Sequence, residues 1–209
     1  MARPRRPIAP DPPDLPDDPP ALDLDPARIE PGASWTGVRI AGVDLGGARL
    51  TSVALRDAEL DGVSLANADA RGAQMRRVAV RGCRMTGLLW NEGALRHVVL
   101  RDCRIDLAAF AATELEQVVF DGCILCQTDF QDADLVCVRF DGCDLTGADL
   151  TGARMAGCEL RACTLDDLRG AEALRGTAMR WEDIVAAAGT FADALGIRVL
   201  DPADWREGC

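Results

Sequence analysis

The amino-acid sequence predicts a solenoid, in which the chain coils into stacked turns around its own apolar axis. Every fifth residue from Trp35 to Leu165 is apolar, at 27 positions without exception, in a chain of 209 residues that is 48% hydrophobic. A second series, two positions earlier, holds a small or branched residue at 24 of its 27 positions. A period of five fits neither an α-helix nor a strand, so the repeat itself defines the architecture.

A longer period indicates how the turns close. Similar pentads recur at a spacing of 20 residues: DGVSL (61–65), RGCRM (81–85), RDCRI (101–105), DGCIL (121–125), DGCDL (141–145) and RACTL (161–165). Equivalent positions in successive turns of a solenoid lie above one another, so similar residues stack. Four pentads per turn therefore make one coil.

The repeat resembles that of the pentapeptide-repeat family, whose motif centres on A-[DN]-L and stands here as NADAR (67–71), DADLV (132–136) and GADLT (147–151). The resemblance covers residues 33–167 and implies an all-β solenoid, a right-handed quadrilateral β-helix. At four pentads per turn, the repeat region makes about 6–7 coils.

The two inward series define the expected core. Leu88 and Gly93 depart from the small-residue rule on either side of Trp90, which predicts a widened coil around the indole. Phenylalanines 20 residues apart are expected to stack along the axis. The structural core is predicted to contain Leu45, Leu50, Leu65, Trp90, Phe110, Phe120, Phe130, Phe140, Leu150, Cys83, Cys103, Cys123, Cys143 and Cys163.

Residues 1–32 form a segment of different composition. Ten of the eleven prolines lie within the first 31 residues, together with seven acidic residues. Such a segment buries too little apolar surface to offset its ordering entropy, so we expect a disordered or polyproline-like tail. This composition favours a solubilising arm over a segment that recruits a partner. Leu22, Leu24 and Ile29 are candidates to close the exposed edge of the first coil.

The five-residue register fails after Leu165, and residues 168–209 are expected to form a terminal unit. Residues 168–176 read as a transition, residues 181–195 as an amphipathic helix that stops at Gly196, and residues 197–200 as a short strand. The apolar stripe of the helix caps the last coil, joins two copies of the chain into a homodimer, or does both. That stripe consists of Trp181, Ile184, Val185, Ala188, Phe191 and Leu195.

No residue pattern indicates catalysis, a cofactor or a metal site. The five cysteines spaced every 20 residues occupy inward positions, where free cysteine packs as a small hydrophobe. Cys126, Cys137 and Cys209 are expected outside the core. The single histidine, His97, points outward without a triad partner. A signal peptide and an 18-residue apolar span are lacking, so the sequence predicts a cytoplasmic protein that does not bind membranes.

Two functions fit an acidic rod of net charge −11. The favoured prediction is a non-catalytic scaffold for a protein partner of unknown identity, supported by outward apolar residues such as Val99, Val119, Leu89 and Ala109. Some members of the family look like acidic rods that occupy the DNA-binding surface of type II topoisomerases and affect quinolone action, and the alternative is such a DNA mimic. It would not bind nucleic acid directly. The candidate acidic face contains Asp69, Asp129, Asp132 and Asp149.

The charge of the predicted coil weighs against mimicry. The outward residues net −6 over the repeat. About 31 Å of DNA duplex carries roughly 18 phosphate charges, at one per ~1.7 Å. Arginines are interleaved with the carboxylates on every face, which further dilutes the acidic character.

Overall fold

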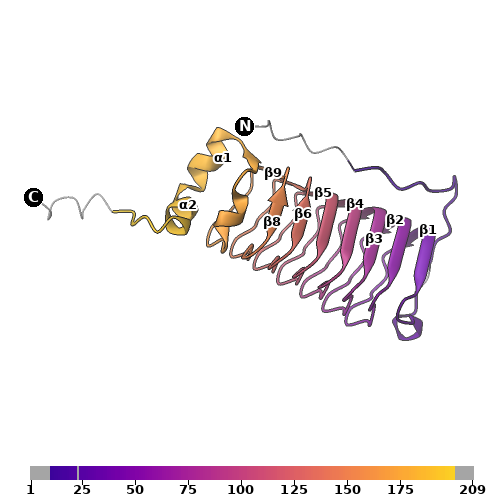
Figure 1. The fold of residues 1–209 in the computed structure, drawn as a ribbon. Coiled ribbons are helices and arrows are strands. Elements are labelled where there is room, and N and C mark those ends of the chain that lie inside the picture. The colour runs from indigo at the N-terminus through magenta and orange to yellow at the C-terminus, as the bar shows by residue number, and fades with distance from the viewer. Residues whose placement is uncertain (1–9, 23, 201–209) are drawn as a thin grey trace, which may run out of the picture.

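The computed structural model describes residues 10–22 and 24–200, which form an elongated rod of stacked coils (Figure 1). Strands from successive coils lie side by side and lead to two short helices at the C-terminal end. The strands are β1 (Ser34–Ala41), β2 (Ala54–Asp61), β3 (Gln74–Arg81), β4 (Ala94–Arg101), β5 (Glu114–Asp121), β6 (Asp134–Val136), β7 (Arg139–Asp141), β8 (Arg154–Ala156), β9 (Glu159–Arg161) and β10 (Ala178–Met179).

The strands from β1 to β9 pair in parallel at a spacing of 20 residues, and β10 pairs with β9 at a spacing of 19. Trp35 pairs with Leu55 and Leu55 with Met75, and the same spacing continues along the sheet. Two further ladders of isolated bridges begin with Asp44–Ser64 and Arg49–Asp69. The predicted all-β solenoid is thereby confirmed, with about seven turns.

The four ladders divide the rod into four faces, which we name by their inward residues. Face A lies over Leu55 and Leu115, face B over Leu60 and Phe120, face C over Leu65 and Leu125, and face D over Ala70 and Phe130. Coils are counted in steps of 20 from residue 33, so that the third coil is 73–92 and the fourth is 93–112.

The inward series forms one continuous core. Every predicted core residue is buried except Cys163, which is half-buried at the last coil. Phe110 stacks on Phe130 at a centroid distance of 5.5 Å, and Phe120 stacks on Phe140 at 4.9 Å. The two stacks meet edge to face across the axis, at 6.2–6.4 Å. This arrangement suits the charge distribution of aromatic rings and confirms the predicted stacks.

Trp90 fits into the core without the widened coil that the sequence predicts. The ladder keeps its 20-residue spacing on both sides of the indole, where Asp69 pairs with Leu89 and Leu89 with Ala109. Gly93 provides the space instead, because a Cβ there would lie 2.6 Å from the Ala73 carbonyl oxygen and would also meet the indole ring. The absence of a side chain at Gly93 therefore leaves room for the Trp90 indole.

The described part of the N-terminal segment lies against the rod, which contrasts with the disordered alternative for this tail and leaves the polyproline-like one open. Residues 10–22, which we call the strap, run along the edge of the strands (Figure 1). Ala21 forms a parallel bridge with Arg39, and Leu22 and Pro20 share backbone hydrogen bonds of 2.9 and 3.1 Å with that residue. Leu22, Leu24 and Ile29 pack against the core at the first coil, as the sequence predicts.

The C-terminal unit corrects two expectations. The single helix is two, α1 (Trp181–Ala186) and α2 (Ala188–Ala194), separated at Ala187, and residues 197–200 form no strand. A short 3₁₀ helix (Ala171–Leu174) precedes them in the transition. The predicted stop is confirmed, because Gly196 has a φ of 67° just past α2.

The helices face the rod with a different stripe from the predicted one. Asp183 and Ala187 are buried, and Thr190 donates to the Leu165 carbonyl at 2.9 Å. Asp183 accepts two hydrogen bonds from Arg180, at 2.8 and 2.9 Å, which satisfy its buried carboxylate. Of the predicted stripe, Phe191 packs against the core, whereas Trp181, Ile184, Val185, Ala188 and Leu195 are exposed.

The inward and outward assignment can be tested within one pentad. Phe130→Asp is expected to unfold the middle of the rod, because it buries an unpaired charge among stacked rings. Asp132→Asn, at an exposed position two residues later, is expected to change the free energy of unfolding by less than about 0.5 kcal/mol. Thermal unfolding followed by circular dichroism measures both, and equal losses would contradict the assignment.

Candidate interaction surfaces

Outward side chains form rows along the rod, because residues 20 apart stack. Ion pairs between neighbouring coils follow from this stacking, as in Arg39–Glu59 (2.9 Å) and Arg154–Asp134 (3.0 Å). Such exposed pairs contribute little to stability, at most about 1 kcal/mol each. Their main consequence is that they neutralise carboxylates that would otherwise face a partner.

Two of the four carboxylates on the predicted acidic face are held by arginines. Arg71 donates two hydrogen bonds to Asp69, at 2.8 and 2.7 Å, and these lower the pKa of Asp69. Asp149 is buried; burial opposes its ionisation, but Thr151 and Arg169, 3.1 Å away, keep its pKa below the ordinary value.

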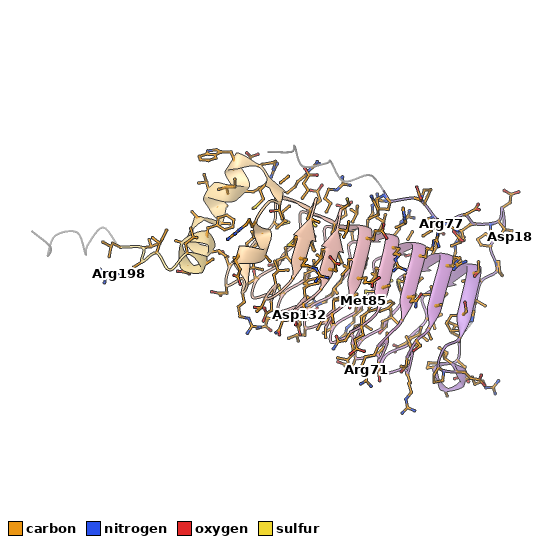
Figure 2. All side chains as sticks on the ribbon, in the orientation of Figure 1. Asp18, Arg71, Arg77, Met85, Asp132 and Arg198 are labelled. Atoms are coloured by element: carbon orange, nitrogen blue, oxygen red, sulfur yellow. The ribbon has the colours of Figure 1, made fainter. Side chains whose placement is uncertain are left out.

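Asp129 and Asp132 remain available on face D. Asp129 is half-buried and accepts a hydrogen bond from the Gln131 amide, and Asp132 is exposed at the edge of the rod, as Figure 2 shows. The structure therefore reduces the predicted four-residue acidic site to two free carboxylates.

Charge is segregated along the rod, which a count by face does not reveal. The third and fourth coils carry seven arginines and three carboxylates, a net charge of +4. The fifth and sixth coils, residues 113–152, carry nine carboxylates and one arginine, a net charge of −8. Summing the charges by coil would have found this pattern in the sequence. The rod thus has a basic belt next to an acidic belt.

Three exposed apolar side chains lie on faces C and D: Leu107 at the corner where face C turns into face D, Leu89 on face D and Ile124 on face C. Leu107 is 55% exposed, Leu89 is 40% exposed and Ile124 is 39% exposed. The three lie in successive coils: Leu89 bridges Ala109, and the Leu107 amide donates to the Cys126 carbonyl, two residues beyond Ile124. We call this surface the apolar corner.

The sequence predicts Leu89 and Ala109 as outward apolar residues, but its pattern does not identify Leu107 and Ile124, which lie on the same two faces. An alignment of the coils at 20 residues carries a signal for Leu107. The equivalent positions are Gly87, Gln127 and Gly147, so a leucine stands where the neighbouring coils have glycine or an amide. This comparison singles out Leu107 as an unusual corner residue.

The cysteine ladder is structural in its contacts. All eight described cysteines are free thiols, and each ladder sulfur lies within 3.8 Å of a carbonyl oxygen 23 residues earlier. Burial raises the pKa of Cys158, a further inward cysteine, to about 11. Cys126 and Cys137 are half-buried, and Cys209 lies outside the described residues. A raised pKa disfavours the reactive thiolate form of Cys158.

His97 faces the strap, since its Nδ1 atom accepts from the Asp11 amide at 3.2 Å. Within residues 10–22 and 24–200, no group of three or more histidine, cysteine or carboxylate residues is arranged to hold a metal ion. Neither α1 nor α2, the α-helices of the described chain, has the length and apolar character that a membrane crossing needs.

Comparison with solved structures finds proteins of low sequence identity and low structural similarity. A trypsin-treated variant of QnrB1, a plasmid-mediated fluoroquinolone resistance protein, is 20% identical, covering 87% of this chain and 98% of that one, with a TM-score of 0.39. HetL of the cyanobacterium Nostoc, involved in heterocyst differentiation regulation, is 19% identical over 73% and 91% of the chains, with a TM-score of 0.25. At these values the likeness supports no conclusion about this chain.

Comparison with protein families gives a direct match. The pentapeptide repeat region family matches residues 73–150 and 107–170, and the family of pentapeptide repeats in eight copies matches residues 48–87. A search of curated proteins finds no match. The matched segments together run through the coils that the structure shows, and the chain belongs to the pentapeptide-repeat family.

Proposed function

We propose that the protein is a non-catalytic scaffold that presents the apolar corner to a protein partner. The observation that carries the proposal is Leu107, which is both exposed and in a left-handed backbone conformation, with a φ of 59°. For a leucine this conformation costs about 1–2 kcal/mol. The Leu107 side chain stabilises neither the core nor the local backbone.

Many corner residues share this left-handed conformation, but among the described ones only Leu107 carries a large aliphatic side chain. An exposed leucine there gains nothing for folding, so it points to function. Glycine or asparagine at position 107 would relieve the backbone and remove exposed apolar surface. Leu89 and Ile124 extend the surface over three coils, and contiguous apolar patches mark sites of protein interaction. The expected partner therefore presents apolar side chains to this corner.

We propose further that the protein is cytoplasmic and catalyses no reaction itself. Eight unpaired cysteines in the described chain fit a reducing compartment, where disulfides are rare. A rod that works by contact needs neither a cofactor nor a catalytic cluster.

Leu107→Asn separates stability from partner binding. The variant is expected to stabilise the rod by about 1 kcal/mol, because asparagine tolerates the left-handed conformation better than leucine. Capture of partners from native cells, measured by quantitative mass spectrometry, is expected to fall at least tenfold. Val136→Asn, at a residue 37% exposed on face A, is the control and is expected to leave capture unchanged. Undiminished capture by the Leu107 variant would refute the proposal.

We further propose a homodimer through the C-terminal helices. Trp181 is 75% exposed, Val185 57% and Leu195 75%, so these apolar side chains of the C-terminal unit are open to solvent. Burial of such side chains against a second copy would remove them from water at roughly 25 cal/mol per Å².

The double variant Trp181→Glu/Val185→Glu is expected to be monomeric in sedimentation at concentrations where the wild type is a dimer. Its melting temperature at low concentration is expected to stay within about 3 °C, since neither residue packs on the core. Arg175→Glu, an exposed charge change in the transition, should leave the dimer intact. A monomeric wild type would exclude the dimer.

The acidic belt is the observation that favours DNA mimicry as the alternative. Two coils of ~9.6 Å carry a net −8, which matches the roughly 6 phosphate charges on that length of duplex. The match is short, however, and the neighbouring belt is basic. Arginines also pair with Glu114, Asp121 and Asp134 from adjoining coils, at 2.5, 3.3 and 3.0 Å.

Inhibition of a type II topoisomerase tests the alternative. We expect the purified protein to leave supercoiling unaffected at micromolar concentrations, because the belt spans only two coils. Asp129→Asn/Asp132→Asn removes the two free carboxylates of face D and serves as the matched variant. Salt-sensitive inhibition by the wild type that this variant loses would favour mimicry over the scaffold.

A further inference from the structure

The strap lies in a row of contacts along the corner where face A turns into face B. The Asp11 amide donates to His97 Nδ1 at 3.2 Å, and the Asp14 amide donates to Asp57 Oδ1 at 3.0 Å. His97 and Asp57 occupy the same position in the fourth and second coils. The strap then ends on Arg39 in the first coil, through the backbone bonds of Pro20 and Leu22.

The spacing of these contacts matches that of a polyproline helix. Two coils span ~9.6 Å, at ~4.8 Å per coil. Three residues of polyproline II span ~9.3 Å, at ~3.1 Å per residue. Pro12 and Pro13 separate Asp11 from Asp14, so the sequence Asp-Pro-Pro-Asp brings a backbone amide to every second coil. An extended, proline-rich segment is therefore in register with the rod.

Charge complements this geometry. Residues 10–22 contain four aspartates and no basic residue, and they lie over coils that include the basic belt. Arg77, from the coil between the two contacts, donates hydrogen bonds to Asp57 at 2.5 and 2.6 Å. These bonds raise the pKa of Arg77, and the carboxylates of Asp14 and Asp11 raise it further. Figure 2 shows Arg77 at the edge of the rod that the strap follows.

Face B continues beyond the strap as an open groove. Pro10, Pro12 and Pro13 line one side of a space of about 380 Å³. The other side includes the row Ala79, Val99 and Val119 with Arg81, Arg101 and Arg139, and Glu59 also lines the space. Ala79 and Val99 are half-buried, whereas Val119, which the sequence predicts on the outside, is buried. Within the described residues, Arg139 Nε is buried without a hydrogen-bond acceptor. An apolar floor with arginines along it suits proline rings and carboxylates.

We infer that the corner between faces A and B, together with the adjoining groove on face B, is a docking site for an extended, acidic, proline-rich segment of a partner protein, and that the strap is the resident occupant of the corner. The partner must displace the strap, whose tether gives it a local concentration on the order of millimolar. The inference goes beyond the proposed scaffold function, because it concerns a different face and its readout is peptide binding. Each test can therefore fail without the other.

Opening the groove in the full-length protein tests the inference. Asp11→Arg/Asp14→Arg places two positive charges beside Arg77 and is expected to release the strap. A fluorescent peptide of residues 10–22 is the probe for the partner segment. We expect it to bind the opened variant at least ten times more tightly than the wild type, measured by anisotropy at ~50 mM salt. Raising the salt to ~200 mM is expected to weaken binding, because the contacts are charged.

Two further variants locate the peptide. Val99→Glu in the opened protein is expected to reduce binding at least tenfold, since it puts a carboxylate in the apolar row. Ala109→Glu, at the equivalent position of face D in the same coil, is the control and is expected to have no effect. Circular dichroism confirms that both variants fold.

Equal affinities of the wild type and the opened variant, or binding that Val99→Glu leaves unchanged, would overturn the inference. A wild-type dimer that the opened variant loses in sedimentation would show that a second copy exchanges straps. That result would also overturn the assignment of the groove to a partner protein.

Discussion

Every part of the rod depends on the hydrogen bonds that each coil makes to the next one, at a spacing of 20 residues. These bonds satisfy the backbone in the middle of the rod, where a free amide or carbonyl would be buried. They also fix which side chains stack, so the core is a set of columns that include the paired phenylalanines. A repeat of this kind derives its stability from neighbouring coils and is exposed at its two ends.

The two ends solve this exposure with different chemistry. At the first coil, Leu22, Leu24 and Ile29 cover the core with apolar side chains, and the strap adds backbone bonds to Arg39. At the last coil, the covering surface is more polar, with Asp183 paired to Arg180 and Thr190 bonded to Leu165. The apolar side chains of α1 and α2 are consequently left on the outside.

The five-residue period was enough to predict the fold and almost every buried residue, because inward positions leave few alternatives. The apolar stripe of the C-terminal helix is compatible with a cap, a dimer contact or both, and its sequence does not decide which side faces the coils. The pair Arg180–Asp183 instead lets a carboxylate be buried there. The composition of the strap predicts a disordered or polyproline-like tail, and it contains no information on a preformed surface such as His97 and Asp57. Counting charges by face does not reveal the basic and acidic belts, because the two kinds of charge are separated along the axis of the rod and not around it.

The contacts of the strap also imply an order of folding events during synthesis of the chain. Its contact from Asp11 to His97 joins residues that are 86 positions apart. The surface that binds the strap is therefore synthesised long after the strap itself. Chains emerge from the ribosome N-terminus first, at roughly 5–20 residues per second. The acidic segment therefore remains without its binding surface until four coils have been made and stacked. Closure of the strap then marks a rod that has grown far enough to hold it.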